Sequence, residues 1–137
     1  DMNYFKAANA LISLINRINN LGLKIMMNGG SEFIDDMNDQ NNSIIRSIWG
    51  YHQEEVFSLI EDYDEGIFGR QNKEDSNYYK KMASIMNKNG AQVFLLEYTN
   101  DEQLKHEIDE FCRIAADTND KVCIVFGMLQ CLFKVSF

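Results

Sequence analysis

The sequence predicts an α/β fold built from parallel βα units. Stripes of apolar residues at helical spacing alternate with short, continuous apolar runs, and turns rich in Gly, Asn and Asp separate them. Continuous apolar runs are typical of parallel strands, because both faces of such a strand are buried. About four strands are visible. Four parallel strands fit either a small open sheet or half of an eight-stranded barrel, and periodicity does not separate the two.

The first two strands are expected in the N-terminal half of the chain. Apolar residues at helical spacing predict a helix over residues 4–20, and the apolar run 23–27 predicts a buried strand. A short helix is expected near residues 31–37, and the next strand at 48–51. Helix and strand alternate here as they do in βα units.

The same alternation continues in the C-terminal half. An apolar stripe predicts a helix over residues 78–86, and the run 93–96 predicts a third strand. Residues 99–102 have the spacing of a capping box, so a further helix is expected to begin there and to continue through Cys112. The run 122–125 predicts the fourth strand. Together these units predict one domain over residues 1–137.

Composition excludes several classes of function. The chain of 137 residues has 45% hydrophobic and 25% charged residues, as soluble globular proteins do, and no apolar run is long enough for a membrane span. A net charge of −8 argues against nucleic acid as a partner. Three widely spaced cysteines and two distant histidines predict neither a metal site nor a disulfide framework. No GxGxxG, P-loop, HExxH or GxSxG motif occurs, so no cofactor is expected.

Candidate site residues follow from the positions of the strand ends. In both parallel architectures, binding groups collect beyond the carboxyl ends of the strands. Polar or aromatic residues at these ends are Asn28, Tyr51, Gln53, Glu54, Glu97 and Tyr98. Structural roles are open for three of them: Asn28 as a turn residue, Glu54 as a cap of a following helix, and Glu97 as a carboxylate bonded to neighbouring backbone.

Four sequence blocks carry a resemblance to a known family. They are KIMMNGGSEFID, WGYHQEEVFSLI, IFGRQNKEDSNYYKK and AQVFLLEYTND, in this order. In combination they resemble glycoside hydrolase family 114, whose members include endo-α-1,4-polygalactosaminidases. The resemblance spans about residues 1–125. It implies a (β/α)8 barrel of the TIM type, of which this chain is the C-terminal half.

The resemblance also implies the chemistry. Two carboxylates would hydrolyse a galactosamine-type polysaccharide without a cofactor, and Glu54 matches the catalytic Glu that follows the sixth strand. The catalytic Asp is expected upstream of this chain, so that Asp1 matches a later, non-catalytic Asp and the chain alone is expected to be inactive. The expected contacts to the polysaccharide or oligosaccharide are Asp1, Asn28, Tyr51, Gln53, Arg70, Glu97 and Tyr98. The full-length protein is expected to be extracellular or at the cell surface.

A second hypothesis from the same features is that the chain is a non-catalytic module. A barrel remnant could bind carbohydrate without turnover, or have a structural role alone. A half barrel would also leave sheet edges and apolar helix stripes uncovered, so the isolated chain is expected to self-associate. The final segment, KVCIVFGMLQCLFKVSF, lacks the polar ending that the family has after its last strand.

Overall fold

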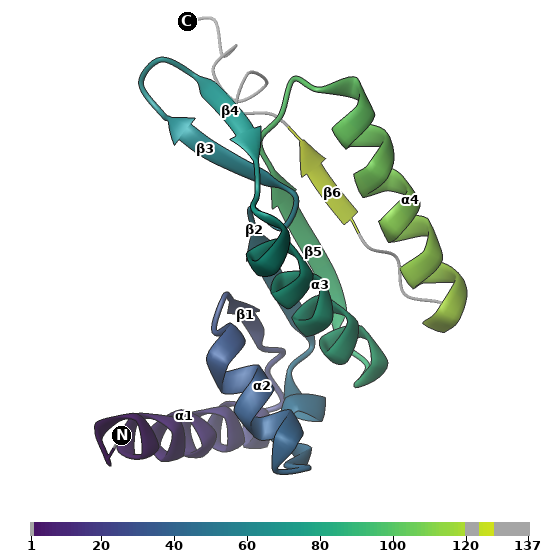
Figure 1. The fold of residues 1–137 in the computed structure, drawn as a ribbon. Coiled ribbons are helices and arrows are strands. Elements are labelled where there is room, and N and C mark those ends of the chain that lie inside the picture. Colours follow the sequence, from purple (N-terminus) through teal and green to yellow (C-terminus); the bar gives the residue numbers. More distant parts are fainter. Residues whose placement is uncertain (1, 120–123, 128–137) are drawn as a thin grey trace, which may run out of the picture.

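The computed structural model describes the backbone of residues 2–119 and 124–127 and the side chains of residues 2–114. It is a mixed α/β structure with a four-stranded parallel sheet and a separate two-stranded hairpin (Figure 1). The α/β class and the parallel strands expected from the sequence are therefore confirmed. Asp1 and the final segment 128–137 lie outside the described residues.

The elements follow one another in the order of alternating helices and strands, interrupted once by the hairpin. They are α1 (Met2–Asn20), β1 (Met26–Asn28), α2 (Ser31–Asp39), the 3-10 helix η1 (Ser43–Ser47), β2 (Gly50–Glu54), β3 (Ser58–Asp62), β4 (Ile67–Arg70), α3 (Lys73–Lys88), β5 (Gln92–Glu97), α4 (Glu102–Asn119) and β6 (Ile124–Gly127).

The structure differs from the sequence prediction around the second strand. β2 begins at Gly50 and extends to Glu54, three residues beyond the predicted end. The buried residues Ile44 and Ile45 before it belong to η1. The antiparallel hairpin β3–β4 was not predicted at all. Its turn contains Gly66 with a φ of 65°, a left-handed conformation that glycine adopts at little cost.

The parallel sheet has the strand order β1-β2-β5-β6, so each strand pairs with the next sheet strand along the chain. The register pairs Met27 with Tyr51, Tyr51 with Val93, and Leu95 with Val125. The crossover helices contact each other in sequence, α2 with α3 and α3 with α4. They therefore form one layer, and that layer packs on one side of the sheet.

The two sides of the sheet differ sharply in burial. Side chains alternate along a strand, and residues paired in register share a side. On the side that we call the covered face, Tyr51 and Leu95 are fully buried against the helices. On the other side, the open face, Met26 is 50% exposed and Phe94 is only partly buried. The hydrophobic core thus lies between the covered face and the helix layer.

A buried carboxylate fastens the hairpin to the sheet. Glu97, at the end of β5, is 1% exposed. Its carboxylate accepts hydrogen bonds from the backbone N–H groups of Val56 at 2.9 Å, Phe57 at 3.1 Å and Ser58 at 2.8 Å, and from the Ser58 hydroxyl at 2.6 Å. Three successive N–H groups form an anion-binding nest. Burial raises the pKa of Glu97, and the hydrogen bonds from Ser58, Phe57 and Val56 act in the opposite direction.

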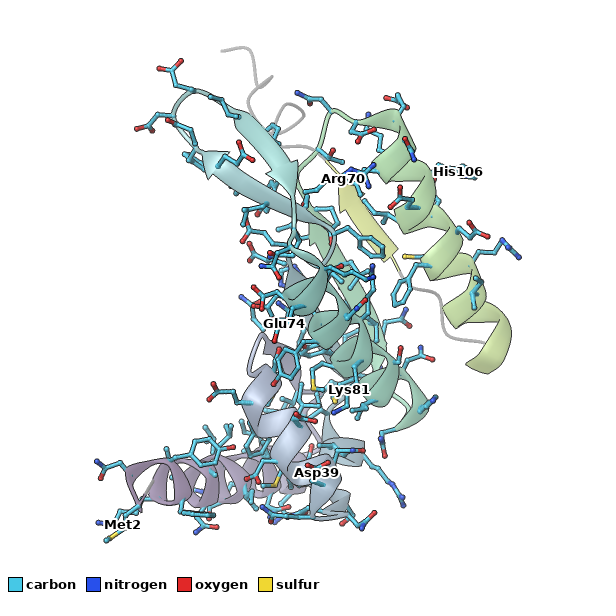
Figure 2. All side chains as sticks on the ribbon, viewed as in Figure 1. Met2, Asp39, Arg70, Glu74, Lys81 and His106 are labelled. Atoms are coloured by element: carbon cyan, nitrogen blue, oxygen red, sulfur yellow. The ribbon has the colours of Figure 1, made fainter. Side chains whose placement is uncertain are left out.

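The hairpin extends beyond the carboxyl ends of the sheet strands (Figure 1). It leaves β2 through Glu55, whose φ of 54° turns the chain away from the strand direction. The Glu55 side chain then accepts a hydrogen bond from the backbone N–H of Ile60 at 2.7 Å. At the other end of the hairpin, Arg70 forms ion pairs with Asp101 at 2.9 Å and Glu107 at 3.1 Å (Figure 2). The hairpin is therefore held by β5 and by the start of α4.

We predict that Glu97→Gln destabilises the whole domain. Glutamine keeps one acceptor oxygen but places an NH2 donor against backbone N–H donors, and each buried donor left without an acceptor costs about 1–3 kcal/mol. Urea unfolding followed by circular dichroism measures the loss. Glu102→Gln is the matched control, because the Glu102 side chain is 85% exposed. Equal stability of the two variants would contradict the role given to Glu97.

Candidate functional site

Four polar side chains gather on the open face at the carboxyl ends of the strands. They are Asn28 from β1, His52 and Glu54 from β2, and Tyr98 directly after β5, and we call them the rim cluster. Asn28 and His52 are register partners, so their side chains share a side of the sheet. Glu54 follows His52 by two residues and therefore lies on the same side. The cluster sits where parallel α/β folds place their binding sites.

The first contact within the rim cluster joins Glu54 to Tyr98. The Tyr98 hydroxyl donates a hydrogen bond to Oε2 of Glu54 at 3.0 Å. The ring of Phe68, from the hairpin, stacks on the Tyr98 ring with centroids 6.4 Å apart. Burial raises the pKa of Tyr98 to about 12, and the hydrogen bond to Glu54 adds to the rise. The hydroxyl thus keeps its proton at neutral pH, and the Glu54 carboxylate is oriented from one side.

The second contact joins His52 to Asn28, with Nδ1 of His52 and Oδ1 of Asn28 2.8 Å apart. His52 was not among the candidates from the sequence, although Gln53 and Glu54, beyond the same predicted strand end, were. The signal that identifies it is its position two residues before Glu54, which places both side chains on one face once both belong to a strand. Asn28 joins the site as expected and pairs with a side chain there.

Tyr51 and Gln53 were expected at the site, but the structure places them on the covered face. The Tyr51 hydroxyl donates to Oε1 of Gln53 at 2.6 Å, and the Ser31 hydroxyl donates to the same oxygen at 3.1 Å. Burial raises the pKa of Tyr51 to about 12. This network joins β2 to the start of α2, so its side chains point away from the rim cluster.

The structure brings neither Glu97 nor Arg70 to the rim cluster. Glu97 ends β5 at the same edge of the sheet, but on the covered face, where it bonds to neighbouring backbone as the structural alternative predicted. Arg70 is occupied by two acidic partners on α4 and the loop before it. Asp1 lies outside the described residues. Glu54, and Glu55 beside it, cap no helix, since the hairpin follows them.

The geometry of the rim cluster suits acid–base chemistry or recognition of hydrogen-bond donors. Oε2 of Glu54 is held by Tyr98, whereas Oε1 makes no hydrogen bond within residues 2–114. The Cα atoms of His52 and Glu54 are about 6–7 Å apart along the strand.

In the part of the chain that the structure describes, no three His, Cys, Asp or Glu side chains are grouped to hold a metal ion. Nor does any helix there have the length and apolar character to cross a membrane.

No family model matches the chain, and no curated protein matches it either. The resemblance to glycoside hydrolase family 114 therefore stays a prediction from the sequence blocks. The function is inferred below from that resemblance together with the placement of Glu54, Tyr98, His52 and Asn28.

We predict that Tyr98 ionises late in an alkaline titration. Its raised pKa of about 12 means that its proton stabilises the folded state. That contribution is complete below pH 10, the ordinary pKa of tyrosine, and is lost as the pH rises through about 12. Ultraviolet absorbance of tyrosinate should show one fewer late-ionising group in Tyr98→Phe than in the wild type. Ionisation of Tyr98 near pH 10 would mean that neither its burial nor its hydrogen bond to Glu54 persists in solution.

Proposed function

We propose that the protein is a glycoside hydrolase that cleaves an amino-sugar polysaccharide of the galactosamine type, with Glu54 as the catalytic acid. The observation that carries this proposal is the position of the Glu54 carboxylate. It lies on the open face, at the carboxyl end of a parallel strand, and is hydrogen-bonded by Tyr98. The family resemblance independently matches a catalytic Glu to this residue.

The strand order supports the proposal that the sheet is part of a (β/α)8 barrel. In doubly wound sheets the strand order reverses and helices cover both sides. Here the order β1-β2-β5-β6 has no reversal, and α2, α3 and α4 form a single layer. In a barrel the helices lie outside and the other side of the sheet faces the interior. The open face would then be the interior side, and the rim cluster would lie at the mouth where barrel enzymes bind substrates.

In the proposed reaction, the protonated Glu54 carboxyl donates its proton to the glycosidic oxygen as the bond to the anomeric carbon breaks. Tyr98 holds Oε2, so Oε1 is the oxygen that faces the substrate. The resemblance implies a second carboxylate, which none of the described open-face side chains supplies.

The net charge of −8 favours a cationic polymer such as one of galactosamine. Because such a polymer does not cross membranes, we place the full-length protein outside the cell or at its surface.

We predict that Glu54→Gln in the full-length protein lowers kcat by about 10²- to 10⁴-fold while polymer binding persists, because glutamine cannot donate the proton. Reducing-end release from a soluble galactosamine polymer measures turnover, and titration calorimetry measures binding.

Glu55→Gln is the matched control, since Glu55 turns towards the hairpin and glutamine retains an acceptor for the Ile60 N–H. Equal turnover in the two variants would remove Glu54 from the mechanism. Binding of the polymer by the wild type without any turnover would favour the non-catalytic module instead.

A further inference from the structure

We propose that His52 is the residue of the rim cluster that determines specificity. Its Nε2 accepts a hydrogen bond from the amino group of the sugar. Asn28 is the positioning residue that keeps Nε2 free of a proton. This inference rests on the proposed function, because it assigns a substrate contact beside Glu54.

The Asn28 contact determines the tautomer of His52. Oδ1 of Asn28 has lone pairs and no hydrogen, so the proton in the 2.8 Å contact belongs to Nδ1 of His52. A neutral imidazole carries a single N–H, and Nε2 is therefore an acceptor. The imidazole of His52 makes no other hydrogen bond within residues 2–114. Nε2 is left to contact a ligand.

The surroundings of His52 select a group that donates several hydrogen bonds. Asn28 contributes a second acceptor, because its Oδ1 has a lone pair beyond the one that the Nδ1–H of His52 occupies. Phe94 is the register partner of His52 on β5 and adds an apolar neighbour. Lys24, a cation near this side of the sheet, lies over Trp49 before the amino end of β2. Within residues 2–114, no ion pair or hydrogen bond joins a lysine or arginine to His52, Asn28 or Glu54.

An ammonium group fits this arrangement, because it has three N–H donors and no acceptor. An N-acetylated amino sugar has one N–H and adds a carbonyl oxygen, which would face the lone pairs of His52 and Asn28. A site with unpaired acceptors discriminates against a ligand that cannot satisfy them. The rim cluster is therefore expected to prefer the free amino sugar to its N-acetylated form.

The first test compares kinetics of the full-length protein on a galactosamine polymer with and without N-acetyl groups. His52→Asn keeps an N–H near the place of Nδ1 but has no acceptor at Nε2. We expect its KM for the free polymer to rise about 10- to 100-fold, with little change in kcat or in the unfolding temperature and with a weaker preference for the free polymer. His52→Gln, whose amide reaches the place of Nε2, should restore part of the affinity.

The second test needs no substrate. ¹⁵N NMR of the His52 imidazole should show Nε2 without a proton in the wild type, and a shift towards the Nε2–H tautomer in Asn28→Leu. An Nε2–H tautomer in the wild type overturns the inference, as does an unchanged KM in His52→Asn when the wild type is active. Absence of hydrolysis by the wild type overturns the proposed function itself, and this role with it. The two failures are thus distinct.

Discussion

The buried carboxylate of Glu97 is the contact on which the rest of the structure depends. It accepts hydrogen bonds from the backbone N–H groups of Val56, Phe57 and Ser58, and so joins the segment after β2 to the end of β5. Through Ser58, which also accepts a hydrogen bond from the backbone N–H of Tyr98 at 2.9 Å, the same contact fixes the start of the hairpin and the residue after β5. The relative positions of Glu54 and Tyr98 follow from this junction.

Successive side chains of a strand point to opposite faces of the sheet, and this alternation separates the structural residues from the candidate functional residues. Odd-numbered residues of β2, Tyr51 and Gln53, face the helices and complete a buried hydrogen-bond network. Even-numbered residues, His52 and Glu54, face the open side and each bond to a residue of a neighbouring strand end. A polar residue at a strand end is therefore a structural residue or a site residue according to the face it occupies.

The sequence predicted the elements whose apolar pattern is strong. The helices and the strands β1, β5 and β6 could be found because their buried residues form stripes or continuous runs. β2 was displaced because its last three residues, His52, Gln53 and Glu54, are all polar, so the strand has no continuous apolar run. A one-residue change of register exchanges the two faces of a strand. For that reason the strand ends predicted Asn28, Glu54 and Tyr98, but could not separate them from Gln53 and Glu97 or reveal His52.

Amide hydrogen exchange at Val56, Phe57 and Ser58 tests most directly whether the Glu97 carboxylate organises the site. Val56 and Phe57 lie in the connection between β2 and β3, and Ser58 is the first residue of β3. Amides in loops and at strand ends normally exchange quickly. Bonded to a buried carboxylate, they should instead be protected as strongly as the amides between β2 and β5. They should lose nearly all of that protection in Glu97→Ala, whereas the helix amides of α3 should lose only the part that follows from the lower stability of the domain. Exchange of the three amides at loop rates in the wild type would contradict the account.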